Sequence, residues 1–217
     1  MDGAAQAQAY GAADFSASDQ AVVERLVELL GPGALGEPLR ILDLGCGPGN
    51  ITFRVAERFP KAQVIGLDGA AAMLALAEQT LNAKPDWRQR VSFLAERLPL
   101  GPPSALAPGF GVLVSNSLLH HLHDPQVLWR TVVELAAPGA MVLIRDLRRP
   151  GRAEQIGELV SRHANGAPAI LQRDYAHSLA AAFTLAEVTD QLQQAGLAQL
   201  QARELDDRYL EVAGRLP

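Results

Sequence analysis

The sequence is poor in several features that would point to particular classes of protein. Cys46 is its single cysteine, so no disulfide can form within the chain. No apolar run approaches the roughly 20 residues that a membrane helix needs. The N-terminal stretch also lacks the basic start, apolar core and cleavage site of a secretory signal. These absences predict a cytoplasmic protein without a membrane segment.

Clustered positive charge is scarce as well. The chain has a formal net charge of -5 at pH 7, and no stretch carries the dense Lys and Arg needed to neutralise a row of phosphates. Nucleic acid is therefore disfavoured as a partner. One basic group stands out, made of Arg145, Arg148, Arg149 and Arg152. It is either a solvated or salt-bridged loop or an anchor for a substrate carboxylate or phosphate.

Short apolar runs alternate with segments of helical period over most of the chain. The apolar runs are typical of strands buried on both faces and occupy residues 39–44, 62–67, 91–94, 110–115 and 140–145. The helical segments occupy residues 51–59, 70–81 and 126–136. Strand followed by helix, repeated, predicts parallel strands with right-handed crossovers. We expect an α/β fold, an open doubly wound sheet in a single domain over residues 1–217.

The N-terminal part departs from this alternation. A helical pattern over residues 18–31 precedes the first strand, with Ser18 as the expected N-cap and Gly31 as the stop. Because this segment stands outside the strand–helix repeat, we expect residues 1–38 to act as a lid.

The C-terminal part departs from it as well. Residues 147–182 insert further helical material, which we expect to form a cap. Thr184 begins the sequence TLAE, a capping box completed by Glu187, so a helix should restart there and run to about Gly196. Two strand-like runs within residues 197–214 predict a terminal hairpin.

The stretch ILDLGCGPGN, residues 41–50, breaks a strand into three glycines at every second position. Such a turn between a strand and a helix predicts backbone N–H groups close to a ligand with no Cβ in the way. A dinucleotide-binding fingerprint would read GxGxxG, but here the third glycine comes one residue early and Asn50 takes its place. A nicotinamide cofactor is therefore disfavoured.

An acidic residue followed by GxGxG, as in DLGCGPG at 43–49, resembles the first motif of the class I S-adenosylmethionine-dependent methyltransferases. The stretches VIGLDGAAAML (64–74), FGVLVSNSLLHHLHDP (110–125) and LAAPGAMVLIRD (135–146) are similar to later segments of that family. The resemblance implies a Rossmann-like sheet of seven strands in the order 3-2-1-4-5-7-6, with the last strand antiparallel.

The resemblance also implies S-adenosylmethionine as cofactor and a set of residues that hold it. Asp68 would accept from the ribose hydroxyls, and it lies 68 − 49 = 19 residues beyond Gly49, near the offset of about 20 expected for such a carboxylate. Asp43 would help to hold the cationic sulfonium end. The other expected cofactor-binding residues are Tyr10, Gly45, Gly47, Gly49, Gly69, Met73, Glu96 and Asn116. For Asp68 a helix N-cap, and for Met73 a core position, are the competing interpretations.

Three histidines crowd the segment LHHLHDP at residues 119–125. A metal site is disfavoured, because adjacent side chains at a turn point in different directions and no second cluster supplies further ligands. Within the resemblance this segment follows the fourth strand, at the edge where ligands gather. We therefore expect His120 or His121 to act as a general base, or else to cap and brace the turn.

Substrate contacts are expected from the lid and from the parts after the fifth strand. The residues named for this role are Arg145, Asp146, Arg173 and Tyr175. Alternatively, Arg173 pairs with Asp174 on the surface and Tyr175 anchors the cap through its ring. A closed cap of this size suits a small molecule.

The resulting hypothesis is an enzyme that transfers the methyl group of S-adenosylmethionine to a small-molecule acceptor by in-line displacement. Positioning alone can lower the barrier of such a reaction by roughly 7–11 kcal/mol. The alternatives are an enzyme of the same fold that transfers another group, a cofactor-binding protein without turnover and, less favoured, an NAD-dependent oxidoreductase.

Overall fold

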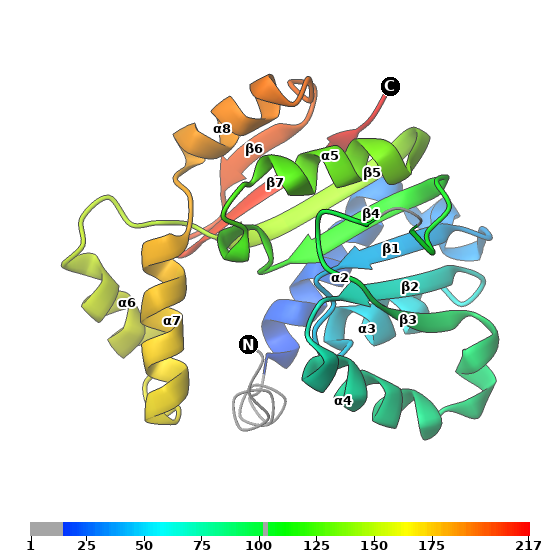
Figure 1. Ribbon diagram of the computed structural model, residues 1–217, viewed down its shortest axis with the longest axis horizontal. Coiled ribbons are helices and arrows are strands. Elements are labelled where there is room, and N and C mark those ends of the chain that lie inside the picture. The colour runs from blue at the N-terminus through cyan, green and yellow to red at the C-terminus, as the bar shows by residue number, and fades with distance from the viewer. Residues whose placement is uncertain (1–14, 102–103) are drawn as a thin grey trace.

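A seven-stranded sheet forms the centre of the computed structural model, which describes residues 15–101 and 104–217 (Figure 1). The strands are β1 (Arg40–Leu44), β2 (Gln63–Asp68), β3 (Val91–Ala95), β4 (Phe110–Asn116), β5 (Ala136–Leu147), β6 (Gln201–Glu204) and β7 (Tyr209–Arg215). The α-helices are α2 (Ser16–Leu30), α3 (Asn50–Arg58), α4 (Ala71–Asn82), α5 (Gln126–Leu135), α6 (Gln155–His163), α7 (Ala169–Ala181) and α8 (Leu185–Gln194). Short 3-10 helices are η1 (Pro32–Gly36), η2 (Pro85–Gln89) and η3 (Leu119–His121).

The sheet has the predicted strand order, β3-β2-β1-β4-β5-β7-β6. Strands β1 to β5 pair in parallel, and β7 runs antiparallel to both β5 and β6. The order reverses between β1 and β4, so the connections leave the sheet in opposite directions there. In open α/β sheets this switch point opens a crevice at the carboxyl ends of the strands, where ligands bind.

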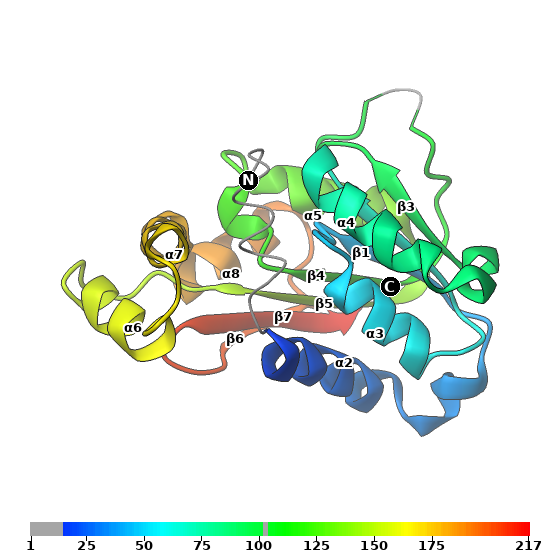
Figure 2. The same cartoon turned by 90° about the horizontal axis from the view of Figure 1, so that it is seen from below.

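Helices cover both faces of the sheet, which explains why the central strands are apolar without alternation. Figure 2 shows α2 and α3 on one face and α5 and α8 on the other. On the first face, Val22, Leu26 and Val55 pack against the strands, and on the second, Trp129 and Leu192 do so. The fold prediction is thereby confirmed.

The predicted start of the first helix is wrong by two residues. Helix α2 begins at Ser16 after Phe15, and the Ser18 hydroxyl donates to the Phe15 carbonyl at 3.0 Å instead of capping the helix. Gly31 ends the helix as predicted, with φ of 80°. Because the inner side of α2 is buried in the core, the described part of the predicted lid is a fixed element of the fold. The lid role itself stays a prediction.

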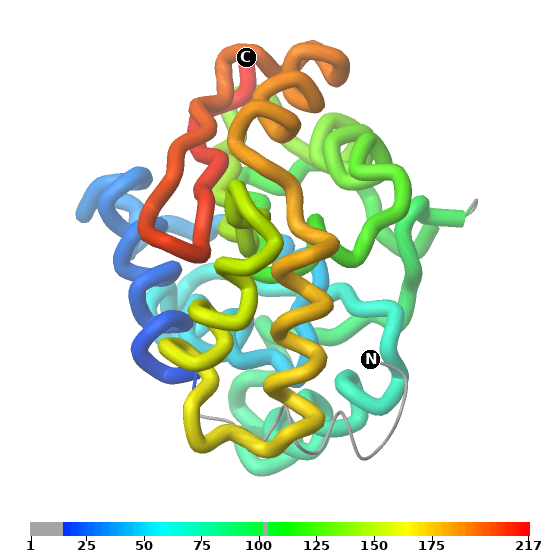
Figure 3. The backbone as a smooth tube through the Cα atoms, turned by 90° about the vertical axis from the view of Figure 1, so that its left-hand side faces the viewer, coloured from blue at the N-terminus to red at the C-terminus, as the bar shows by residue number. Residues whose placement is uncertain are grey.

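The predicted insertion after the fifth strand contains α6 and α7. These helices stand beside the carboxyl ends of the central strands (Figures 1 and 3). They share a small core of their own, formed by Leu147, Leu159, Leu179 and Ala182. Helix α7 also contacts η3, the turn that follows β4. The insertion is therefore placed to cover the crevice, as a cap would.

The capping box at the start of α8 is present as predicted. The Thr184 hydroxyl oxygen accepts from the Glu187 N–H at 3.3 Å, and the Glu187 carboxylate accepts from the Thr184 N–H at 2.7 Å. The box satisfies two backbone donors that the helix itself leaves without partners.

Replacing Thr184 with Ala should lower the free energy of unfolding by about 1 kcal/mol, because one of these donors loses its acceptor. Thr189→Ala, on the exposed side of the same helix, is the matched control and should change it less. Urea denaturation of the three proteins measures the difference. Equal losses in both variants would contradict the capping role.

Candidate active site

The turn between β1 and α3 lies at the switch point of the sheet. Glycine occurs at its different positions for different physical reasons. Gly47 has φ of 55°, and a Cβ built on it would meet no atom within 4 Å. A Cβ on Gly49 would come within 2.8 Å of Phe53 and 2.9 Å of Phe93. Gly49 is therefore required by packing, whereas Gly47 presents bare backbone to open space, where a ligand can approach.

The expectation that N–H groups of this turn lie close to a ligand stays a prediction, but four of these groups have partners within the protein. The N–H groups of Gly45 and Cys46 both donate to the Leu67 carbonyl, and that of Gly49 donates to the Cys46 carbonyl. The Gly47 N–H donates to the Asp68 carboxylate at 2.8 Å. These four N–H groups are thus bonded internally, and the turn offers a ligand open space beside Gly47.

Asp43, at the end of β1, is buried and anchors the helix that follows the turn. Its carboxylate accepts from the Thr52 hydroxyl at 2.6 Å and also from the Thr52 N–H, in the first turn of α3. Burial raises the pKa of Asp43 to about 7, and the nearby carboxylates of Asp68 and Asp19 act in the same direction. Its predicted contact with a cofactor stays a prediction.

Asp68, at the end of β2, holds the turn from the other side. One carboxylate oxygen accepts from the Gly47 N–H, and the other accepts from the Ala70 N–H at 2.7 Å. It is not the N-cap of α4, since that position is occupied by Ala70. A carboxylate has about four acceptor positions, so Asp68 retains capacity for further donors such as ribose hydroxyls.

The exit of β4 lies against the glycine turn. The side chain of Leu118 occupies the space beside Gly45, where a Cβ would come within 2.9 Å of it. Ser117 has φ of 62°, a left-handed conformation that costs a non-glycine residue energy and that clusters at functional sites. Asn116 donates from its amide to the Ser117 hydroxyl at 3.3 Å. Neither Ser117 nor Leu118 was predicted from the sequence as a site residue.

His120, in the η3 turn, is paired with Asp146 at the end of β5. The His120 Nδ1 and Asp146 Oδ1 atoms are 2.5 Å apart, and the second Asp146 oxygen accepts from the Leu119 N–H at 2.7 Å. Both side chains are almost fully buried. The predicted contact of Asp146 with substrate is corrected, because both of its oxygens are turned toward η3.

His121 differs from its neighbour. The residue keeps an exposed face, and its ring lies 4.1 Å from the His120 ring between centroids. Burial of the inner part of the ring, and then the neighbouring His120, lower the pKa of His121 to about 4. The structure thus separates the two histidines that the sequence left as equal candidates for a base.

Three further residues predicted to bind the cofactor lie near the same edge but are engaged otherwise. Met73 is buried on α4, which favours its core interpretation. Glu96 accepts from the Ser104 hydroxyl and the Ala105 N–H, each at 3.1 Å, and so holds the loop after β3. Gly69 is exposed, and a Cβ on it would come within 2.6 Å of the Arg97 side chain. Tyr10 lies outside the described residues.

The predicted substrate residues of β5 and the cap are spread apart. Arg145 is half-buried and donates to the Ser18 carbonyl at 3.3 Å, which ties β5 to α2. Arg173 is exposed and lies 3.9 Å from Asp174, the surface pair that was the alternative. Tyr175 packs against the core of the cap. Burial raises its pKa to about 12.

Asp19 on α2 is a buried carboxylate that the sequence did not single out. It lies close enough to Asp43 to raise the pKa of that residue, as Asp68 also does. Asp43, just before the glycine turn, is thus near two further carboxylates, Asp68 on β2 and Asp19 on α2. Together the three carboxylates make a negative environment that favours a cationic group.

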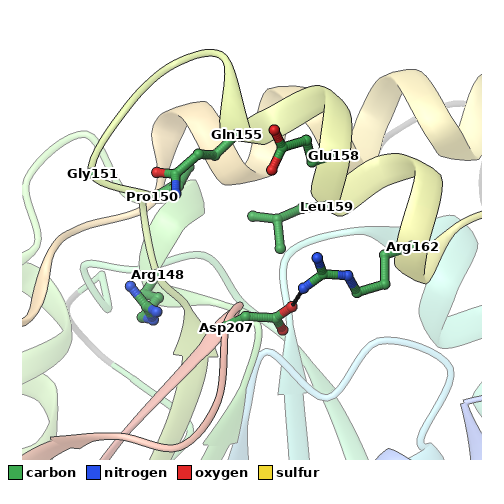
Figure 4. A pocket seen from close by; sticks show the side chains of 8 residues that line it. All are labelled: Arg148, Pro150, Gly151, Gln155, Glu158, Leu159, Arg162 and Asp207. Carbon is green, nitrogen blue, oxygen red and sulfur yellow. Dashed lines mark hydrogen bonds and ion pairs between the residues drawn. The ribbon is translucent and has the colours of Figure 1, made fainter.

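A separate cavity of about 360 Å³ lies between α6 and the turn that joins β6 to β7 (Figure 4). Its charged lining is balanced, with Arg148 and Arg162 against Glu158 and Asp207. Arg162 pairs with Asp207. In the basic group of the sequence, Arg148 lies 3.5 Å from Glu204 and Arg149 pairs with Glu187, so two of its four arginines are salt-bridged. None of the predicted site residues lines this cavity.

Residues 15–101 and 104–217 contain neither a group of side chains suited to a metal ion nor a helix suited to crossing a membrane. No group of three or more His, Cys, Asp and Glu side chains there is arranged to hold a metal ion. No helix within those ranges is both long and apolar enough to span a bilayer.

Comparisons with known proteins agree on the family. Residues 42–142 match the methyltransferase domain family. The chain is 37% identical over 118 residues to a trans-aconitate 2-methyltransferase of Variovorax paradoxus, covering 54% of this chain and 42% of that protein. It is 32% identical over 147 residues to the trans-aconitate 2-methyltransferase of Methylobacterium nodulans, covering 67% and 52%. The chain thus spans about half the length of the curated relatives it matches.

A solved structure shows the same fold over the whole chain. A SAM-dependent methyltransferase from Aquifex aeolicus superposes with a TM-score of 0.69 at 17% identity, covering 98% of both chains. At this identity the likeness supports the strand order and the placement of the helices.

The raised pKa of Asp43 predicts how stability depends on pH. Since the pKa of Asp43 is about 7 in the folded state against an ordinary value of 3.8, the folded protein holds an extra proton between these pH values. The free energy of unfolding should therefore fall as pH rises from about 4 to about 7. In Asp43→Asn, which still accepts from Thr52 and cannot ionise, this fall should be smaller by up to a few kcal/mol.

Urea denaturation at several pH values measures this dependence. Asp124→Asn is the control, because the Asp124 side chain is 57% exposed and its removal should change the pH dependence little. An unchanged slope in Asp43→Asn would show that the buried carboxylate is not the group responsible.

Proposed function

The chain belongs to the class I S-adenosylmethionine-dependent methyltransferases, and on this basis we propose that it transfers the methyl group of S-adenosylmethionine to a small-molecule acceptor. The observation that carries the proposal is the open side of Gly47 between the carboxylates of Asp43 and Asp68. A nucleoside sulfonium has no phosphate to be bound by backbone N–H groups, so an internally bonded turn suits it. It carries a positive charge, which three nearby carboxylates favour.

The residues can be assigned to parts of the cofactor. Asp68 would accept from the ribose hydroxyls with the acceptor positions left by Gly47 and Ala70. Asp43 and Asp19 would stabilise the cationic end through their charge, since both are buried beside the turn. Asn116 lies at the exit of β4, the strand next to β1, and would contact the same end. When bound, S-adenosylmethionine supplies the methyl group, and the protein aligns the acceptor with it.

The acceptor is a separate question. The relatives from Variovorax and Methylobacterium are named for trans-aconitate, so this tricarboxylic acid is one candidate acceptor. The chain matches only about half of those proteins, and the segments over the crevice, α6 and α7, are the parts that would select the acceptor. A small molecule fits the enclosed position of η3 beneath α7.

Transfer of radioactivity tests the activity. The protein is incubated with methyl-tritiated S-adenosylmethionine and a metabolite extract, and the label is followed by chromatography. We expect label in a small molecule, with S-adenosylhomocysteine as the second product. If all label stays on the cofactor although calorimetry shows that S-adenosylhomocysteine binds, the proposed methyl transfer is wrong.

A matched pair of glycine variants tests the cofactor position. Gly47→Ala and Gly139→Ala both place a methyl group on a left-handed residue with open space around it, so both should lose about 1 kcal/mol of stability. Only Gly47→Ala puts that methyl group where the cofactor would lie. We expect its affinity for S-adenosylhomocysteine to fall at least about tenfold, the effect of about 1.4 kcal/mol of overpacking.

Isothermal titration calorimetry gives the affinity, and urea denaturation gives the stability. Gly139→Ala should bind as the wild type does, because Gly139 lies at the opposite end of β5 from the crevice. Equal affinity of the two variants would place the cofactor elsewhere.

A further inference from the structure

His120 occupies a position between the glycine turn and the cap. Leu118, two residues before it, packs on Gly45 in the turn, and helix α7 contacts η3 from the other side. The His120 side chain is only 3% exposed. An acceptor molecule that approaches the cofactor position beneath the cap would therefore come close to this imidazole, which is itself shielded from water.

The partner of His120 fixes the chemical character of its ring. Asp146 can only accept hydrogen bonds when ionised, so the hydrogen on the neutral ring lies on Nδ1, 2.5 Å from the carboxylate. The lone pair then lies on Nε2, at the far side of the ring. Among residues 15–101 and 104–217, no hydrogen bond to Nε2 is found. With Nδ1 bonded to Asp146, Nε2 is the acceptor atom of the neutral ring.

This arrangement distinguishes a hydroxyl acceptor from a carboxylate acceptor. A carboxylate is ionised at neutral pH and attacks a methyl group without a base. Its oxygens would also be repelled by the lone pair on Nε2. A hydroxyl group donates to Nε2 and becomes a strong nucleophile only as its proton leaves. His121 is less suited to accept that proton, because its pKa lies near 4.

We infer, on the premise of the proposed methyl transfer, that the acceptor group is a hydroxyl whose proton passes to Nε2 of His120, and that Asp146 is the positioning residue. As the oxygen–methyl bond forms, the bond from sulfur to the methyl carbon breaks and its electron pair stays on sulfur. The products are a methyl ether and S-adenosylhomocysteine. The imidazolium formed is stabilised by the Asp146 carboxylate and loses its proton to solvent before the next turnover.

The competing role for this pair is purely structural, since Asp146 also braces η3 through the Leu119 N–H. Asp146→Asn separates the two roles. The Asn oxygen can still accept from Leu119, whereas its NH₂ group would donate to Nδ1 and force the ring hydrogen onto Nε2. The turn is kept, and the acceptor character of Nε2 is lost.

The chain provides a matched control in a second His–Asp pair. The His163 Nε2 atom, on α6, lies 2.9 Å from Asp207 Oδ1. Asp207 lines the separate cavity, which none of the predicted site residues lines. Asp207→Asn makes the same chemical change away from the crevice. It should leave turnover and the His120 ring as in the wild type.

Nitrogen-15 NMR of the imidazoles gives a readout that does not depend on activity. At neutral pH we expect the wild-type His120 ring to carry its hydrogen on Nδ1, and Asp146→Asn to move it to Nε2. Asp207→Asn should leave the His120 signals unchanged. A wild-type ring with its hydrogen on Nε2, or one that is unaffected by Asp146→Asn, overturns the inference.

The labelled product gives the second readout. A methyl ether keeps its tritium in mild alkali, whereas a methyl ester releases it as volatile methanol. We expect alkali-stable label. In Asp146→Asn the rate of methyl transfer should fall about 10²-fold or more, as for loss of a general base. The affinity of the Asp146→Asn variant for S-adenosylhomocysteine should be unchanged. An ester product with normal cofactor binding overturns the hydroxyl assignment alone, whereas absence of S-adenosylhomocysteine binding by the wild type refutes the proposed function itself.

Discussion

Two carboxylates at the ends of neighbouring strands determine the shape of the site. Asp43 holds the first turn of α3 through Thr52, and Asp68 holds the glycine turn through the Gly47 N–H. The turn can therefore keep three residues in left-handed conformations and still leave one side open. The arrangement has a cost, since burial beside two other carboxylates raises the pKa of Asp43 to about 7. A bound cation would stabilise the ionised carboxylates, so the same charges that shape the turn favour a cationic ligand.

Most of the fold follows from local patterns in the sequence. Continuous apolar runs placed the central strands, and the capping box at Thr184 placed the start of α8, because each signal is complete within a few residues. The predicted start of α2 was wrong because the Ser18 hydroxyl donates back to the Phe15 carbonyl within the first turn of the helix, instead of accepting from the N–H groups that follow it. Strand β5 begins earlier than predicted, at Ala136, where a shift in register with β4 lengthens the pairing. No local pattern encodes such a shift.

The site was only partly predictable, and the reason lies in distance along the chain. The glycines and Asp68 could be placed from their spacing, since they belong to one strand–helix–strand unit. Asp146 was assigned to substrate contact because its sequence neighbours give no sign of His120, which is 26 residues away. Asp19 went unnoticed because the packing of α2 against α3 and β5 brings it near Asp43. Residues that meet through sheet order or helix packing require the three-dimensional structure.

The sheet order also explains why binding and chemistry share one crevice. Pairing of β1 with β4 brings the β4 exit to the glycine turn, and pairing of β4 with β5 brings Asp146 to η3. The same His–Asp chemistry at His163 and Asp207 lies on α6 and the hairpin, without a cofactor turn beside it. A His–Asp pair is therefore not a catalytic feature by itself. At His120 it gains a function in our proposal because two parallel pairings place it between the cofactor position and the cap, where an oriented lone pair can meet an acceptor.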